Sequence, residues 1–182
     1  MVDLAGYVGR LGDALGSLKA DDLERAKALL FAMRSRGGTV WVCGNGASAA
    51  NAGHCVAHLS ERGFRTVDMA ARTPSLTALS NDHGYAKAWL LMLRQAATRG
   101  DCLLAISASG DSPNVLAALA EARRIGMATL GLLGFGGGAA LSLCDVAVVV
   151  RAAIYGPVED AHSAVIHVLT DASPPSVFEA AP

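Results

Sequence analysis

Residues 39–62 read TVWVCGNGASAANAGHCVAHLSER, a short apolar run followed by a glycine turn and an alanine-rich segment. The run 40–43 has the composition of a buried strand. The turn that follows, with Gly44 and Gly46, lets the backbone approach a ligand closely. A helix starting after such a turn directs free backbone N–H groups at an anion, and Ser48 adds a hydroxyl. This stretch therefore predicts a strand, a phosphate-binding turn and a helix in succession.

The same alternation continues along the chain. Apolar runs predict further strands at 66–69, 102–106, 127–132 and 146–150, and amphipathic patterns predict helices at 74–79, 85–98, 113–125 and 158–171. Residues 80–84 are expected to form a polar break. Two helices are predicted within 1–36, the second capped by Asp21 and Asp22. Strands that alternate with helices predict an α/β fold, a parallel sheet covered on both faces. We expect one domain over residues 1–182, with a frayed tail at 174–182.

Composition excludes several classes of protein. The net charge of −1 gives no electrostatic case for nucleic-acid binding. No apolar run reaches the roughly 18 residues that cross a membrane, so no membrane association is expected. Residues 1–18 lack the basic start and the long apolar core of a signal peptide. The four cysteines (Cys43, Cys55, Cys102 and Cys144) have no metal-type spacing. They indicate buried thiols in a reducing cytoplasm.

A second polar loop follows the run 102–106. Ser107, Ser109 and Ser112 cluster there, and Ser112 with Pro113 has the pattern of a helix start. Three hydroxyls with nearby backbone N–H groups can bind a phosphate without a lysine. In parallel sheets ligands lie beyond the carboxyl ends of the strands. The two loops are therefore expected to face one phosphate pocket.

Histidines and one glutamate share faces of two predicted helices. His54 and His58 are one turn apart, and Glu159 and His167 are about two turns apart, whereas His162 lies about 60° off the Glu159 direction. Two histidines on one helix with a glutamate and a histidine on another form a candidate set of four zinc ligands. The alternative is a pair of polar helix faces in a cleft without metal.

Three segments together resemble a known family. CGNGASAANAGH, ISASGDSPNV and EDAHSAVIH resemble the SIS (sugar isomerase) domain, and are most similar to sedoheptulose 7-phosphate isomerases, also called phosphoheptose isomerases. The resemblance covers nearly the whole chain, including the helical N-terminus. It implies a three-layer, doubly wound sheet of about five parallel strands, a homotetramer with active sites between subunits, and aldose–ketose isomerisation of a seven-carbon sugar phosphate. It also implies zinc, which many members bind.

The resemblance also implies roles for individual residues. Substrate contacts are implied for Asn45, Gly46, Ala47 and Ser48 in the first loop, for Asn81 and Asp82, for Ser107, Ala108, Ser109 and Ser112 in the second loop, and for Arg62 as an active-site arginine. Ala108 replaces the usual threonine. His54 and His167 match two metal-binding or catalytic histidines.

The chain departs from the family pattern at two positions. His58 stands where the family has the glutamate that is its expected proton-abstracting base, and Glu159 stands where it has a glutamine. The residues before Glu159 also differ, Pro157-Val158 in place of Arg-Ile. The site therefore keeps one carboxylate, moved to the last helix, where it is also expected to contact substrate. His54, His58, Glu159 and His167 remain a candidate zinc set.

These departures leave three hypotheses. The first is an isomerase that converts sedoheptulose 7-phosphate to D-glycero-D-manno-heptose 7-phosphate through an enediol. In it Glu159 or His167 acts as base, His58 acts as acid or zinc ligand, and the metal holds the oxyanion. The second is an isomerase of another sugar phosphate. The third is a non-catalytic SIS module of the type that associates with the replication initiator. His167, which that type loses, is retained here and favours chemistry.

Overall fold

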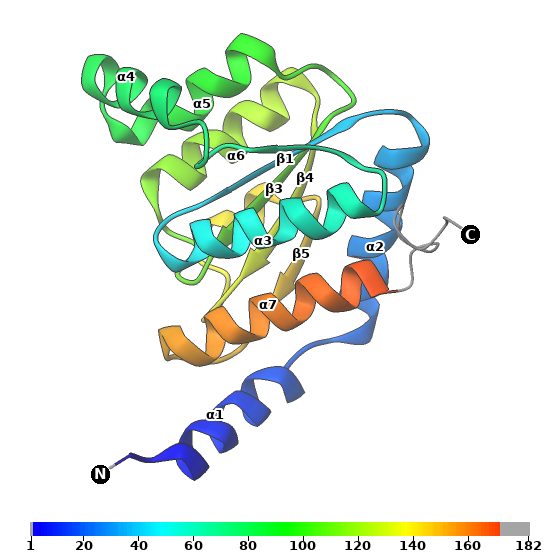
Figure 1. Ribbon diagram of the computed structural model, residues 1–182, viewed down its shortest axis with the longest axis vertical. Coiled ribbons are helices and arrows are strands. Elements are labelled where there is room, and N and C mark those ends of the chain that lie inside the picture. The colour runs from blue at the N-terminus through cyan, green and yellow to red at the C-terminus, as the bar shows by residue number, and fades with distance from the viewer. Residues whose placement is uncertain (1, 172–182) are drawn as a thin grey trace.

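Five parallel strands form the central sheet of the computed structural model, which describes residues 2–171 (Figure 1). They are β1 (Thr39–Gly44), β2 (Arg65–Asp68), β3 (Cys102–Ser107), β4 (Ala128–Leu133) and β5 (Val146–Val149), in the spatial order β2-β1-β3-β4-β5. The chain leaves β1 toward one edge and returns to the other side of β1 at β3. The carboxyl ends of β1 and β3 are therefore the point where the strand order reverses, the usual ligand position in such sheets.

Helices cover both faces of the sheet (Figure 1). Their bounds are α1 (Leu4–Gly16), α2 (Ala20–Ser35), α3 (Ala47–Glu61), α4 (Thr73–His83), α5 (Tyr85–Ala96), α6 (Pro113–Ile125), the short 3₁₀ helix η1 (Ala139–Leu143) and α7 (Tyr155–Asp171). One apolar core lies between the sheet and α2, α3 and α7, and another lies between the sheet and α5 and α6. The predicted three-layer, doubly wound fold is confirmed.

Alternation along the strands produces these two cores. In β1, Val40 and Val42 belong to the core under α3 and α7, whereas Trp41 and Cys43 belong to the core under α5 and α6. Every residue of β3 is buried, as expected for a central strand with helices on both sides. Cys43 pairs with Ala105 across β1 and β3, which brings the loops after both strands to the same height.

The main differences from the sequence prediction concern the ends of helices. The segment 80–84 does not break the helix, because α4 continues to His83 and ends at Gly84, whose φ is +83°. α7 begins at Tyr155 rather than near Val158. Pro157 is tolerated in the first helical turn because no helical carbonyl precedes it there that it could clash with. Asp21 and Asp22 lie inside the first turn of α2 and do not cap it; the N-cap residue is Lys19. The predicted frayed tail at 174–182 lies outside the described residues.

Two helices have little support from the sheet. α1 projects from the rest of the chain and lies against α7 (Figure 1), where the Tyr7 hydroxyl donates to Asp160 at 2.5 Å. Leu4 and Val8 of α1 are exposed. None of the eleven residues of α4, all within the described part, is buried.

No helix among residues 2–171 is both long and apolar enough to cross a membrane.

Candidate active site

A cavity of about 110 Å³ opens at the carboxyl ends of β1 and β3. Its described lining consists of Asn45, Ser48, Ile106, Ser107, Ala108, Ser109, Ser112, Tyr155 and Glu159. Seven of these nine residues are ones that the sequence singled out. Ile106 and Tyr155 were not predicted, because Ile106 reads as part of a buried strand and Tyr155 falls before the helix predicted at 158–171. The topology thus brings both polar loops and one carboxylate into one cavity.

The serine loop is shaped by its own hydroxyls. Ser107 Oγ accepts a hydrogen bond from the Gly110 N–H at 3.1 Å, and Ser109 Oγ accepts one from the Asp111 N–H at 3.2 Å. Because both hydroxyl oxygens act as acceptors, their protons remain available to a ligand. Ser112 is the N-cap residue of α6 as predicted, but its hydroxyl makes no capping bond to a described residue. All three hydroxyls can therefore donate to an anion in the cavity.

The first loop delivers Asn45 and Ser48 to the same cavity. Gly46, with φ of +55°, is the N-cap of α3, and Ser48 is buried in its first turn. The Asn45 amide is hydrogen bonded to Asn114 and to the Tyr85 hydroxyl. Gly46 and Ala47 are exposed and are not among the described lining residues.

The parallel helices α3 and α7 lie side by side on one face of the sheet (Figure 1). Asn51 Nδ2 donates to the Glu159 carbonyl at 2.9 Å and so joins the start of α3 to the start of α7. The Glu159 side chain is half-buried and lines the cavity. This places a carboxylate next to the serine loop, where it can exchange a proton with a bound molecule.

Three histidines meet farther along the same pair of helices. One ring nitrogen each of His54, His58 and His167 lies within 4.8 Å of the others, and His54 Nε2 is 2.7 Å from His167 Nε2. The His58 Nδ1 faces the Glu61 carboxylate at 3.9 Å, a neighbour that the sequence analysis missed. Glu159, the fourth predicted zinc ligand, is not part of this group.

The histidine group suits a metal ion. Burial, and then the neighbouring His58 and His167, lower the pKa of His54, which favours the neutral imidazole that binds metals. Imidazole nitrogens are preferred ligands of zinc. The Glu61 carboxylate lies 3.9 Å from His58 Nδ1, which is beyond hydrogen-bond distance. The donor set therefore fits a zinc-type ion bound by three histidines.

Other predicted residues are not among those that line the cavity. Arg62 follows the last residue of α3, about 20 Å along the helix from Ser48. Asn81 and Asp82 are exposed on α4, where Asn81 Nδ2 donates to Asp82 Oδ1 at 2.9 Å. His162 is fully buried, and burial lowers its pKa to about 4, so it belongs to the core rather than the site.

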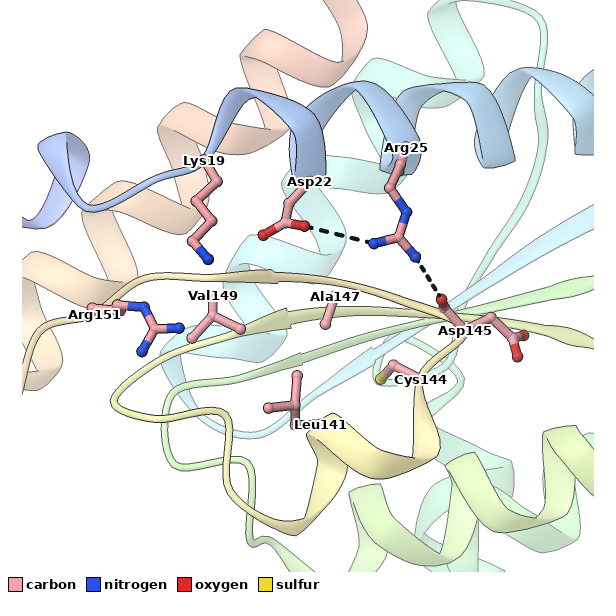
Figure 2. Close-up of a pocket in the computed structure, with 9 residues that line it drawn as sticks. All are labelled: Lys19, Asp22, Arg25, Leu141, Cys144, Asp145, Ala147, Val149 and Arg151. Atoms are coloured by element: carbon pink, nitrogen blue, oxygen red, sulfur yellow. Dashed lines mark hydrogen bonds and ion pairs between the residues drawn. The ribbon is translucent and has the colours of Figure 1, made fainter.

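A larger cleft, of about 250 Å³, lies along β5 at the outer edge of the sheet. Figure 2 shows Lys19, the N-cap residue of α2, with Asp22 and Arg25 of that helix above the cleft and Leu141 below it. Arg25 forms an ion pair with Asp22 at 3.7 Å and donates to the Asp145 carbonyl at 3.3 Å. None of the site residues predicted from the sequence lines this cleft, so its size does not make it the candidate active site.

Comparison with known proteins gives consistent matches. The sequence model of the SIS domain matches residues 5–134. The phosphoheptose isomerase of Desulfovibrio desulfuricans is 35% identical over 176 residues, which cover 93% of this chain and 84% of that protein. The phosphoheptose isomerase of Pelobacter propionicus is 37% identical over 161 residues, covering 85% of each chain. The structure of phosphoheptose isomerase GmhA from Neisseria gonorrhoeae superposes with a TM-score of 0.88 at 28% identity, covering 92% of this chain and 95% of that one.

Proposed function

We propose a function from the family to which the chain belongs, the SIS domain family and within it the phosphoheptose isomerases. The proposed reaction is the interconversion of sedoheptulose 7-phosphate and D-glycero-D-manno-heptose 7-phosphate. The chain is an isomerase that acts on a phosphosugar. The observation that carries the proposal is the cavity at the ends of β1 and β3, which brings together residues of two polar loops and one carboxylate. We also propose that the enzyme is cytoplasmic, because sugar phosphates occur in that compartment and because its four cysteines are free thiols, as expected in a reducing environment.

The serine loop binds the phosphate in this proposal. Ser107, Ser109 and Ser112 donate their hydroxyl protons, and the N-terminus of α6 adds its backbone N–H groups and the positive end of its dipole. Ala108 lines the cavity through a position where the family has threonine. With the phosphate fixed here, the sugar chain extends toward Asn45, Ser48 and Glu159.

Glu159 is the general base. Aldose–ketose isomerisation removes a proton from the carbon beside the carbonyl and returns one to the neighbouring carbon through an enediol. Glu159 lines the cavity, whereas His167 belongs to the histidine group and is not among the residues that line it. The carboxylate on α7 can therefore take the proton from one carbon and return it to the former carbonyl carbon, while the hydroxyl proton beside it passes to the former carbonyl oxygen.

His54, His58 and His167 hold a zinc ion in this proposal. Such an ion, when bound, stabilises negative charge on a sugar oxygen as a Lewis acid. His58 then serves as a ligand rather than as an acid. The Glu61 carboxylate lies near the His58 ring, and the hydrogen bond from Asn51 to the Glu159 carbonyl joins α3 to α7.

An assay of the purified protein with sedoheptulose 7-phosphate tests the function. We expect an aldose 7-phosphate product, loss of turnover after a chelator removes bound metal, and recovery when zinc is added. Elemental analysis before and after chelation measures the zinc content. If the protein binds the sugar phosphate but does not convert it, with or without zinc, the proposed isomerase activity is contradicted. A regulatory role would then remain.

We further propose that the enzyme is a homotetramer. The exposed Leu4 and Val8 on α1 and the unburied α4 offer surfaces that a neighbouring subunit can cover. Arg62, Asn81 and Asp82, which do not line the cavity of their own chain, can then complete a site between subunits. We expect a tetramer by light scattering, and smaller species after Leu4→Asp and Val8→Asp together. A tetramer that survives both substitutions would exclude α1 from the interface.

A further inference from the structure

The side-chain amide of Asn45 is held by three hydrogen bonds. Its Nδ2 donates to Asn114 Oδ1 at 3.0 Å, and its Oδ1 accepts from Asn114 Nδ2 at 2.9 Å, so the two amides form a closed pair. The Tyr85 hydroxyl also donates to Asn45 Oδ1, at 2.7 Å. Asn45 lies between these contacts and the cavity that it lines.

Counting donors and acceptors shows what remains for a ligand. An asparagine side chain has two N–H donors and an oxygen with two acceptor positions. Both acceptor positions of Asn45 Oδ1 are used, by Asn114 and by Tyr85, and one of its two N–H groups is used by Asn114. A single N–H remains.

We infer that Tyr85 and Asn114 are positioning residues that lock the Asn45 amide, so that it offers the substrate one N–H donor and no acceptor. This inference rests on the proposed function and names a specificity element of the same site. The group opposite Asn45 must then be an acceptor: a carbonyl oxygen, a hydroxyl lone pair or the oxygen of a developing enediolate.

Asn114 is itself fixed. It is buried at the start of α6, and its Oδ1 also accepts the N–H of Val115 at 3.0 Å. The oxygen therefore has two donors, and the orientation of the Asn114 amide is determined before any ligand arrives. Because Asn114 cannot turn, it determines the orientation of Asn45 as well.

Tyr85 connects the end of α4 with Asn45. It is the first residue of α5 and follows Gly84, where α4 ends after Asn81 and Asp82. Its ring packs on Trp89, with centroids 5.9 Å apart, and desolvation raises the pKa of its phenol, which keeps the proton available. The Tyr85 hydroxyl thus joins the end of the otherwise unburied α4 to the cavity.

The chemical consequence concerns the transition state. An amide whose oxygen accepts two hydrogen bonds is polarised, and its remaining N–H becomes a better donor. Such a donor interacts most strongly with an oxygen that gains negative charge during the reaction. Loss of the lock should therefore lower kcat more than it raises KM.

The Tyr85→Phe variant tests the lock, because it removes the hydroxyl and keeps the ring. We expect kcat to fall roughly 3–10-fold, the range for one lost hydrogen bond, with KM changed less than about twofold. Tyr7→Phe is the matched control, since that hydroxyl donates to Asp160 outside the cavity, and it should keep wild-type kcat. Asn114→Asp replaces the donor to Asn45 by a carboxylate oxygen and should lower kcat further than Tyr85→Phe.

A spectroscopic readout separates this inference from the proposed function. In ¹⁵N-labelled protein, the side-chain amide signals of Asn45 and Asn114 should shift in Tyr85→Phe and stay in place in Tyr7→Phe. This holds even if sedoheptulose 7-phosphate is not turned over, an outcome that would overturn the function alone. Unmoved Asn45 signals, or a rise in KM with unchanged kcat, would overturn the lock.

Discussion

Replacing Glu159 with glutamine should lower kcat by a factor of roughly 10²–10⁴, the usual contribution of a general base. Glutamine has nearly the same size and can keep contacts in the cavity, but it cannot take a proton. Because Glu159 is half-buried and its backbone is held by Asn51, the substitution should leave the fold intact. KM should change little, and the melting temperature should stay within a degree or two of the wild type.

The family pattern suggests a sharper version of this experiment. The family pattern that the sequence resembles has a glutamate at the position of His58 and a glutamine at that of Glu159, as noted in the sequence analysis. The double variant His58→Glu, Glu159→Gln restores that arrangement, but it puts the carboxylate in the histidine group, which does not line this cavity, and should therefore not recover the activity that Glu159→Gln loses. Asp160→Asn is the control, since its carboxylate is exposed and bonded to Tyr7. Substantial turnover in Glu159→Gln would assign the base to His167 instead.

Replacing Gly110 with alanine should be the most damaging single-methyl change in the serine loop. Gly110 has φ of +71°, and a Cβ there would overlap the backbone carbonyl of Gly137. The left-handed conformation costs an alanine about 1–2 kcal/mol, and relief of a backbone overlap adds a similar amount. We expect a loss of roughly 2–5 kcal/mol in the free energy of unfolding, seen as a melting temperature lower by about 5–15 °C.

The loop that Gly110 packs against, between β4 and η1, provides the control for that change. Gly136 is exposed, its conformation suits any residue, and a Cβ there meets no heavy atom within 4 Å. Gly136→Ala should therefore melt within about 2 °C of the wild type. Equal melting temperatures for the two alanine variants would mean that the Gly110 turn moves at little cost.

Much of the fold was readable from the sequence because each strand is a short apolar run between a helix and a polar loop. The runs at 40–43 and 102–106 gave both strands whose ends form the cavity, and the serines after the second run gave the phosphate loop. The break predicted at 80–84 failed because serine, asparagine and aspartate also occur in the last turn of a helix. Only the positive φ at Gly84 ends α4.

The site was harder to predict because a helical wheel shows which residues share a face but not how far apart they lie along the helix axis. Glu159 and His167 share a face, but eight residues separate them by about 12 Å along α7. The structure accordingly places Glu159 in the cavity and His167 with the other histidines. Tyr85 and Asn114 had no local signal at all, since their role depends on contacts with Asn45, which is far away in sequence.

The cysteines have a practical consequence for work on this protein. Cys55 directly follows His54 in α3, but it faces the core, and burial raises its pKa to about 12, as it does for Cys43 in β1. Burial also raises the pKa of Cys102 and of the partly exposed Cys144. Thiol-directed dyes react with the thiolate form of cysteine. Because the pKa of each of the four cysteines is raised, all four remain in the unreactive thiol form. A single cysteine engineered on α4 can therefore carry a fluorophore or spin label in the otherwise native sequence, and report on that helix during turnover.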